Sequence, residues 1–227
     1  MNLLPLAQLG GHIDVEMVAA IIAVIFLAIG IHEYCHAKFA DLAGDPTPRA
    51  MGRVTLNLFK HFELLGSIMI LITALAGYGI GWGKPVMMDP RRMKNPKWDH
   101  FIAVLAGPMS NLVQAAVFAV LLRLVGAYVV SVPFLLYFLF FGVMINVSLF
   151  VFNLIPIGPL DGMWLLGTFM PDKTRLAWTR FNLTIGQFVF LGLVLIRFPD
   201  GSSPLSIIMG PLRSTLARVL LGHDLGM

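Results

Sequence analysis

Two histidines and a glutamate near the start of the chain have the spacing of a metal site. His32 and His36 are four residues apart and Glu33 follows the first of them, which gives the pattern H-E-x-x-H. Residues four apart lie on one face of an α-helix, so both imidazoles can reach a single zinc ion. Glu33 lies beside that face, where its carboxylate can take a proton from a water molecule that the zinc activates. The pattern therefore predicts a zinc site capable of hydrolysis.

The residues around this pattern indicate that it lies inside a membrane. Hydrophobic residues make up 58% of the chain and charged residues 12%, against about 25% charged residues in a soluble domain. The pattern continues an apolar stretch that begins at Met17. Ionisable side chains within a membrane usually mark function, although polar residues that cap a helix at the membrane interface are an alternative. The basic residues lie in loops, which favours a role in topology over nucleic-acid binding.

A catalytic zinc ion normally takes three protein ligands and leaves its fourth position open, so a third ligand is expected elsewhere. Asp161 is the best candidate because it follows a long apolar stretch. Pro156, Pro159 and Gly162 surround it and can break the helix, which lets the carboxylate turn back toward the core. Taken alone, an Asp-Gly pair is equally typical of a turn at the membrane surface. The presence of His32 and His36 elsewhere in the chain favours the interpretation of Asp161 as a zinc ligand.

The hydropathy pattern predicts an all-α polytopic membrane protein, a bundle of about four to six transmembrane helices. A small β-hairpin at 53–57, where apolar and polar residues alternate, and a re-entrant element at 64–80, which ends in several glycines, are expected after the first helix. We expect one membrane-embedded domain, 1–227, with a catalytic core at about 15–170 and accessory C-terminal helices at 181–223. The predicted helices cover residues 17–43, 98–125, 132–155, 181–196 and 204–221.

The two halves of the predicted site constrain the topology. For Asp161 to meet the histidines, the helix that carries His32 and the helix before Asp161 must run in the same direction, which requires an odd number of crossings between them. Residues 64–80 therefore should not be a plain span. Basic residues lie on both sides of this segment, and the positive-inside rule places both flanks in the cytosol. We expect the active site to open to the cytosolic side and the N-terminus to lie outside.

Three motifs together resemble the site-2 protease family of intramembrane zinc metalloproteases. They are H-E-x-x-H at 32–36, A-G-P-x-x-N at 106–111 and N-x-x-P-x-x-P-L-D-G at 153–162. The resemblance implies one Zn²⁺ per chain, with His32, His36 and Asp161 as its ligands and Glu33 as the general base. It also implies that Asn153 contacts the substrate backbone or the oxyanion. The short chain is similar to the compact members of the family, which lack PDZ and CBS domains.

The resemblance further implies a multi-pass protein of a prokaryotic cell membrane that hydrolyses peptide bonds within or near transmembrane helices. Such cleavage would serve regulated intramembrane proteolysis or the clearance of membrane proteins. The expected partners are a transmembrane-helix substrate and the lipid bilayer, without nucleic acid. The alternative is a catalytically silent zinc-binding membrane scaffold or helix chaperone, against which the intact Glu33 argues.

Three further polar residues have two interpretations each. Asn111 and Asn146 could hydrogen-bond near the metal, or could join helices within the membrane. His61 could gate the site or bind substrate, or could be a solvated residue at the interface. The predicted hairpin at 53–57 and the stretch at 85–87 could present a strand edge to an unwound substrate, or could fill the cavity from below.

Overall fold

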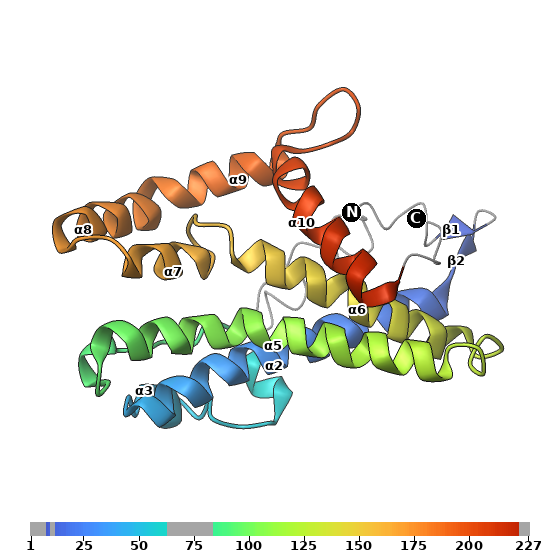
Figure 1. The fold of residues 1–227 in the computed structure, drawn as a ribbon, viewed down its shortest axis with the longest axis horizontal. Helices are drawn as coiled ribbons and strands as arrows, with labels where there is room; N and C mark the ends of the chain where they lie inside the picture. Colours follow the sequence, from blue (N-terminus) through green and yellow to red (C-terminus); the bar gives the residue numbers. More distant parts are fainter. Residues whose placement is uncertain (1–7, 10–11, 63–83, 223–227) are drawn as a thin grey trace.

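The computed structural model describes residues 8–9, 12–62 and 84–222 and shows a bundle of long helices (Figure 1). Within these residues, four helices are long and apolar enough to cross a membrane. They are α2 (Val15–Ala43), α5 (Pro96–Val125), α6 (Pro133–Asn153) and the continuous run Asp172–Leu195, which consists of α8 (Asp172–Phe181), the π-helical turn η3 (Asn182–Gly186) and α9 (Gln187–Leu195). The predicted helical membrane protein is confirmed.

Helix α2 begins and ends at residues that cap it. The Asp14 side chain accepts a hydrogen bond from the Met17 backbone N–H at 3.0 Å, as is typical of an N-cap. At the other end, Gly44 has a φ of 107° and its N–H bonds to the carbonyls of Ala40 and Asp41. A residue with a side chain would be strained in this left-handed conformation. These caps fix a single helix that contains the whole H-E-x-x-H pattern.

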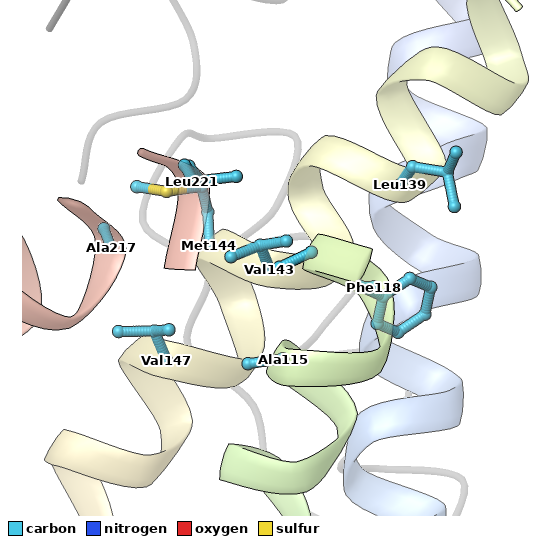
Figure 2. Packing of buried hydrophobic residues seen from close by; sticks show 9 residues of the cluster. Ala115, Phe118, Leu139, Val143, Met144, Val147, Ala217 and Leu221 are labelled. Atoms are coloured by element: carbon cyan, nitrogen blue, oxygen red, sulfur yellow. The ribbon is translucent and has the colours of Figure 1, made fainter. Parts of the chain in front are cut away.

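Helices α2, α5 and α6 form the core of the bundle. In Figure 1, α2 (blue) and α6 (yellow) run in one direction and α5 (green) runs in the other. The two helices that lead to the predicted ligands are therefore parallel, as the site requires. Helix α10 (Pro204–Leu221) packs on the other side of α6. Figure 2 shows the apolar side chains that fill the space between these helices, which include Ala115, Phe118, Val143, Val147 and Leu221.

The β-hairpin predicted at 53–57 is wrong. These residues form bends and are followed by a short 3-10 helix, η1 (Leu58–His61). The alternating pattern does not correspond to alternating burial, because Arg53 is buried whereas the apolar Leu56 is 69% exposed. The stretch instead leads into η1, where Phe59 packs on Phe26 of α2 with ring centroids 4.9 Å apart. The paired strands in the described residues are β1 (Gln8–Leu9) and β2 (His12–Ile13), which lie before α2. The strand edge expected at 53–57 is therefore absent from this loop.

The predicted re-entrant element at 64–80 lies outside the described residues, but its flanks are described. The Lys84 backbone N–H donates to the His61 carbonyl at 2.8 Å. The Arg53 guanidinium donates to the carbonyls of Lys60 and Lys84 and ties the same two stretches together. Both flanks therefore lie next to each other beside the middle of α2, where Phe62 stacks on Phe26 with ring centroids 4.8 Å apart. This agrees with a segment at 64–80 that begins and ends at the same depth.

Candidate metal centre

Three side chains from distant parts of the chain converge between the helices. The Nε2 atoms of His32 and His36 are 2.9 Å apart, and Asp161 Oδ2 lies 3.2 and 3.3 Å from them. Both histidines are buried, and the Asp161 side chain is 19% exposed. Tetrahedral zinc with bonds of about 2.0–2.1 Å holds its ligand atoms about 3.3 Å apart. The three atoms therefore form a triangle of the size of one face of such a site.

The chemistry of these atoms fits a bound cation. His32 Nδ1 lies 2.7 Å from Asn111 Oδ1, and His36 Nδ1 lies 2.9 Å from the Ala103 carbonyl oxygen. Since both oxygens are acceptors, both Nδ1 atoms carry the proton and both Nε2 lone pairs point inward. Asp161 Oδ2 is buried and has no hydrogen-bond partner among the described residues. Two lone pairs and a carboxylate oxygen at this separation repel one another unless a cation lies among them.

Gly107 of α5 leaves the space that such a cation needs. A β-carbon at this position would lie 2.8 Å from His32 Nε2 and closer still to His36 Nε2. Any other residue would therefore block the two imidazoles. Gly107 belongs to the motif A-G-P-x-x-N at 106–111, but the sequence indicates no contact between it and the ligands. Its contact with both histidines depends on how α5 crosses α2, which spacing along the chain does not reveal.

Glu33 lies beside the three candidate ligands and interacts electrostatically with each of them. Its side chain is 14% exposed, and its Oε2 atom is 4.0 Å from Arg53 Nη2. Arg53 is only 2% exposed, and this burial lowers the pKa of its guanidinium although Glu33 raises it. In the sequence, Arg53 is one of the basic residues before the predicted re-entrant element, and nothing in its spacing indicates a buried cation beside the predicted general base.

Asp161 is positioned by a loop that the C-terminal helices anchor. The residue lies between α6 and α7 (Gly162–Thr168). Asn182 Oδ1 accepts the Gly158 N–H at 2.6 Å, and Trp178 Nε1–H donates to the Met163 carbonyl at 2.8 Å. A side chain at position 162 would meet the backbone carbonyls of the residues that begin the loop. We expected the helices after 181 to be accessory, but Asn182 holds the loop that carries a candidate ligand.

The remaining predicted residues lie at the edge of this centre. Asn153 is the last residue of α6, and its Nδ2 donates to the Leu149 carbonyl one turn earlier. No described hydrogen bond joins it to the candidate ligands, so its role stays a prediction. His61 is fully buried, with Nε2 2.9 Å from the Thr55 carbonyl oxygen. The interpretation of His61 as a solvated residue is wrong.

A buried cluster of two histidines and an aspartate in a helical membrane bundle defines a membrane-embedded metalloprotease of the H-E-x-x-H type. The family model described as Peptidase family M50 matches residues 127–196. The chain is 32% identical over 196 residues, 84% of its length and 86% of the relative's, to the "Putative zinc metalloprotease YwhC" of Bacillus subtilis. It is 32% identical over 161 residues, 69% of the chain and 60% of the relative, to the "Putative zinc metalloprotease Rip2" of Mycolicibacterium smegmatis.

The chain belongs to peptidase family M50, the site-2 protease family, so the resemblance noted from the three motifs is confirmed. No solved structure matches it.

Proposed function

We propose that this protein is a zinc-dependent intramembrane endopeptidase, which hydrolyses peptide bonds within or near the transmembrane helices of membrane proteins. The observation that carries this proposal is the convergence of His32, His36 and Asp161 within a bundle of membrane-crossing helices. Membership of peptidase family M50 supports it. One Zn²⁺ per chain is proposed as the cofactor, with these three residues as its ligands.

The residues around the ligands would each have a distinct part in hydrolysis. Zinc bound by the three ligands would polarise the scissile carbonyl and lower the pKa of a water molecule to about 7. The Glu33 carboxylate accepts a proton from the attacking water and later donates it to the leaving amine. Arg53, 4.0 Å away, is placed to restrain that carboxylate. Asn153 is proposed to bind the substrate backbone or the oxyanion near the end of α6.

The charge distribution supports a site that opens to the cytosol. The end of the bundle where α2 ends and α5 begins carries basic residues, among them Arg49, Arg91 and Lys94. Exposed aromatic rings of Trp98 and Phe169 lie 6.0 Å apart at the same end, as is typical of a membrane–water interface. We propose that this end faces the cytosol and that the protein lies in a prokaryotic cell membrane, since both relatives are bacterial.

The experiment that tests the activity compares wild type with Glu33→Gln in the membranes of the cells that express them. Glutamine keeps the shape of the side chain but cannot act as a base. New protein N-termini within or next to transmembrane segments, identified by mass spectrometry, should accumulate with wild type and not with the variant. Equal amounts in the two membranes, with zinc bound to both proteins, would contradict the proposal. That result would favour the alternative, a catalytically silent zinc-binding scaffold or helix chaperone.

A further inference from the structure

We propose that Asn111 and Asn146 are positioning residues that form a hydrogen-bond relay and hold His32 in its metal-binding tautomer. This inference rests on the proposed zinc site and assigns a role to two residues that lie outside the ligand set. The relay runs through three helices, from the Gly142 carbonyl of α6 through the two asparagine side chains to His32 of α2. Both asparagines are 0% exposed.

The direction of the relay is fixed at its far end. Asn146 Nδ2 donates to the Gly142 carbonyl at 2.8 Å. A backbone carbonyl can only accept, so the amide nitrogen of Asn146 must face it and Oδ1 must face away. Asn111 Nδ2 then donates to Asn146 Oδ1 at 3.0 Å and to the Ala28 carbonyl at 3.3 Å. Since both partners of Asn111 Nδ2 are acceptors, its Oδ1 is the atom that remains for His32.

The consequence for His32 follows from this orientation. Asn111 Oδ1 lies 2.7 Å from His32 Nδ1, so Nδ1 carries the proton and Nε2 keeps its lone pair toward His36 and Asp161. Rotating the Asn111 amide by half a turn would place its oxygen against the oxygens of Ala28 and Asn146. No bulk water reaches these buried groups to offset such a contact, which makes the reversed arrangement costly.

The two histidines differ in what fixes their tautomers. His36 Nδ1 bonds to the backbone carbonyl of Ala103, which a substitution of a neighbouring side chain does not remove. His32 depends on a side chain, Asn111, and through it on Asn146. A substitution at Asn111 should therefore weaken zinc binding although it leaves all three candidate ligands in place.

The test measures zinc affinity of the detergent-purified full chain by competition with a chromophoric chelator. Asn111→Leu should bind zinc about 10- to 100-fold more weakly than wild type, the effect typical of losing a partner of a ligand histidine. Asn146→Leu should show a smaller loss in the same direction. Nitrogen-15 NMR of the histidine side chains in the zinc-free protein reports the tautomer itself. His32 should be protonated at Nδ1 in wild type and should become a mixture of tautomers in Asn111→Leu, while His36, which bonds to the Ala103 carbonyl, stays protonated at Nδ1 in both. The tautomer of His32 alone would not change if Asn111 only joined helices.

Gln114→Leu is the matched control. Gln114 is a buried amide of the same helix, but neither of its side-chain atoms has a hydrogen-bond partner among the described residues, so its replacement should leave zinc affinity unchanged. Affinities of Asn111→Leu and Gln114→Leu that both equal wild type would overturn the relay, as would a tautomer of His32 that is unchanged in Asn111→Leu. If Asn111→Leu fails to fold, equal affinities of Asn146→Leu and Gln114→Leu would overturn it.

These outcomes are distinct from failure of the proposed function. A wild type that binds zinc without cleaving membrane proteins would contradict the proposed activity and would leave the relay intact. If Asn111→Leu binds zinc with the same affinity as wild type, only the relay is overturned. A wild type without zinc would overturn both.

Discussion

A β-carbon at Gly107 would lie in the space in front of both imidazole Nε2 atoms, 2.8 Å from that of His32. Zinc binding therefore requires three donor atoms and also a residue without a side chain at position 107. Substitutions near the site should separate these requirements, because zinc binding and stability respond to them differently.

Gly107→Ala is predicted to abolish zinc binding while the protein remains folded. The reason is steric, because the new methyl group meets the two histidine side chains. Zinc content by atomic absorption and helix content by circular dichroism measure the two effects. Gly210→Ala in α10 is the control, since no atom lies within 4 Å of a β-carbon there. Gly210→Ala should keep its zinc. If Gly107→Ala loses helix content while Gly210→Ala does not, the loss of zinc reflects unfolding and the steric account is contradicted.

Acidification is predicted to destabilise the zinc-free protein through His61. Burial lowers the pKa of this imidazole, which outweighs its bond to the Thr55 carbonyl. A lowered pKa means that the unfolded chain binds the proton more readily, so stability falls as pH drops below the ordinary value of about 6.5. The Tm of wild type should fall more between pH 7.5 and 5.5 than that of His61→Gln. Parallel decreases in the two proteins would contradict this role.

Element packing explains why the site assembles from distant segments. Helix α2 presents both histidines because they are one turn apart, and Gly44 ends that helix as expected from the sequence. Asp161 was predicted from the chemistry of zinc, which requires a third ligand. Its anchor was not predicted, because the bond between Asn182 and Gly158 joins residues 24 positions apart. The hairpin at 53–57 failed because alternation over five residues did not report burial there: Leu56 is exposed, and the buried residue is Arg53, whose guanidinium bonds to the carbonyls of Lys60 and Lys84.

Asn182→Leu is predicted to weaken zinc binding several-fold. The amide holds the Gly158 N–H, so its loss should loosen the loop that carries Asp161 while leaving His32 and His36 in place. Thr184→Val, in the same π-helical turn, removes a hydroxyl that bonds only to its own helix and serves as the control. Chelator competition measures both, and equal zinc affinities for the two variants would show that the C-terminal helices do not position the loop.

The whole molecule is a bundle whose two ends differ in charge, which leads to a prediction of its orientation. Single cysteines at positions 94 and 128, introduced in a Cys35→Ala background, lie at opposite ends of the bundle, because the Lys94 N–H bonds to the Ala43 carbonyl where α2 ends, whereas Tyr128 follows the end of α5. A membrane-impermeant maleimide should label Tyr128→Cys in intact cells and Lys94→Cys only after the cells are permeabilised. The reverse pattern would place the site on the outer side.

The central claim is that two motifs far apart in the chain form one zinc site. Zinc content per chain in wild type, His32→Ala and Asp161→Ala, each purified in detergent and reconstituted with zinc, tests it most directly. The structure predicts close to one zinc in wild type and little or none in either variant, because each variant removes one corner of the triangle formed by His32, His36 and Asp161. Full zinc content in Asp161→Ala, or none in wild type, would contradict the account.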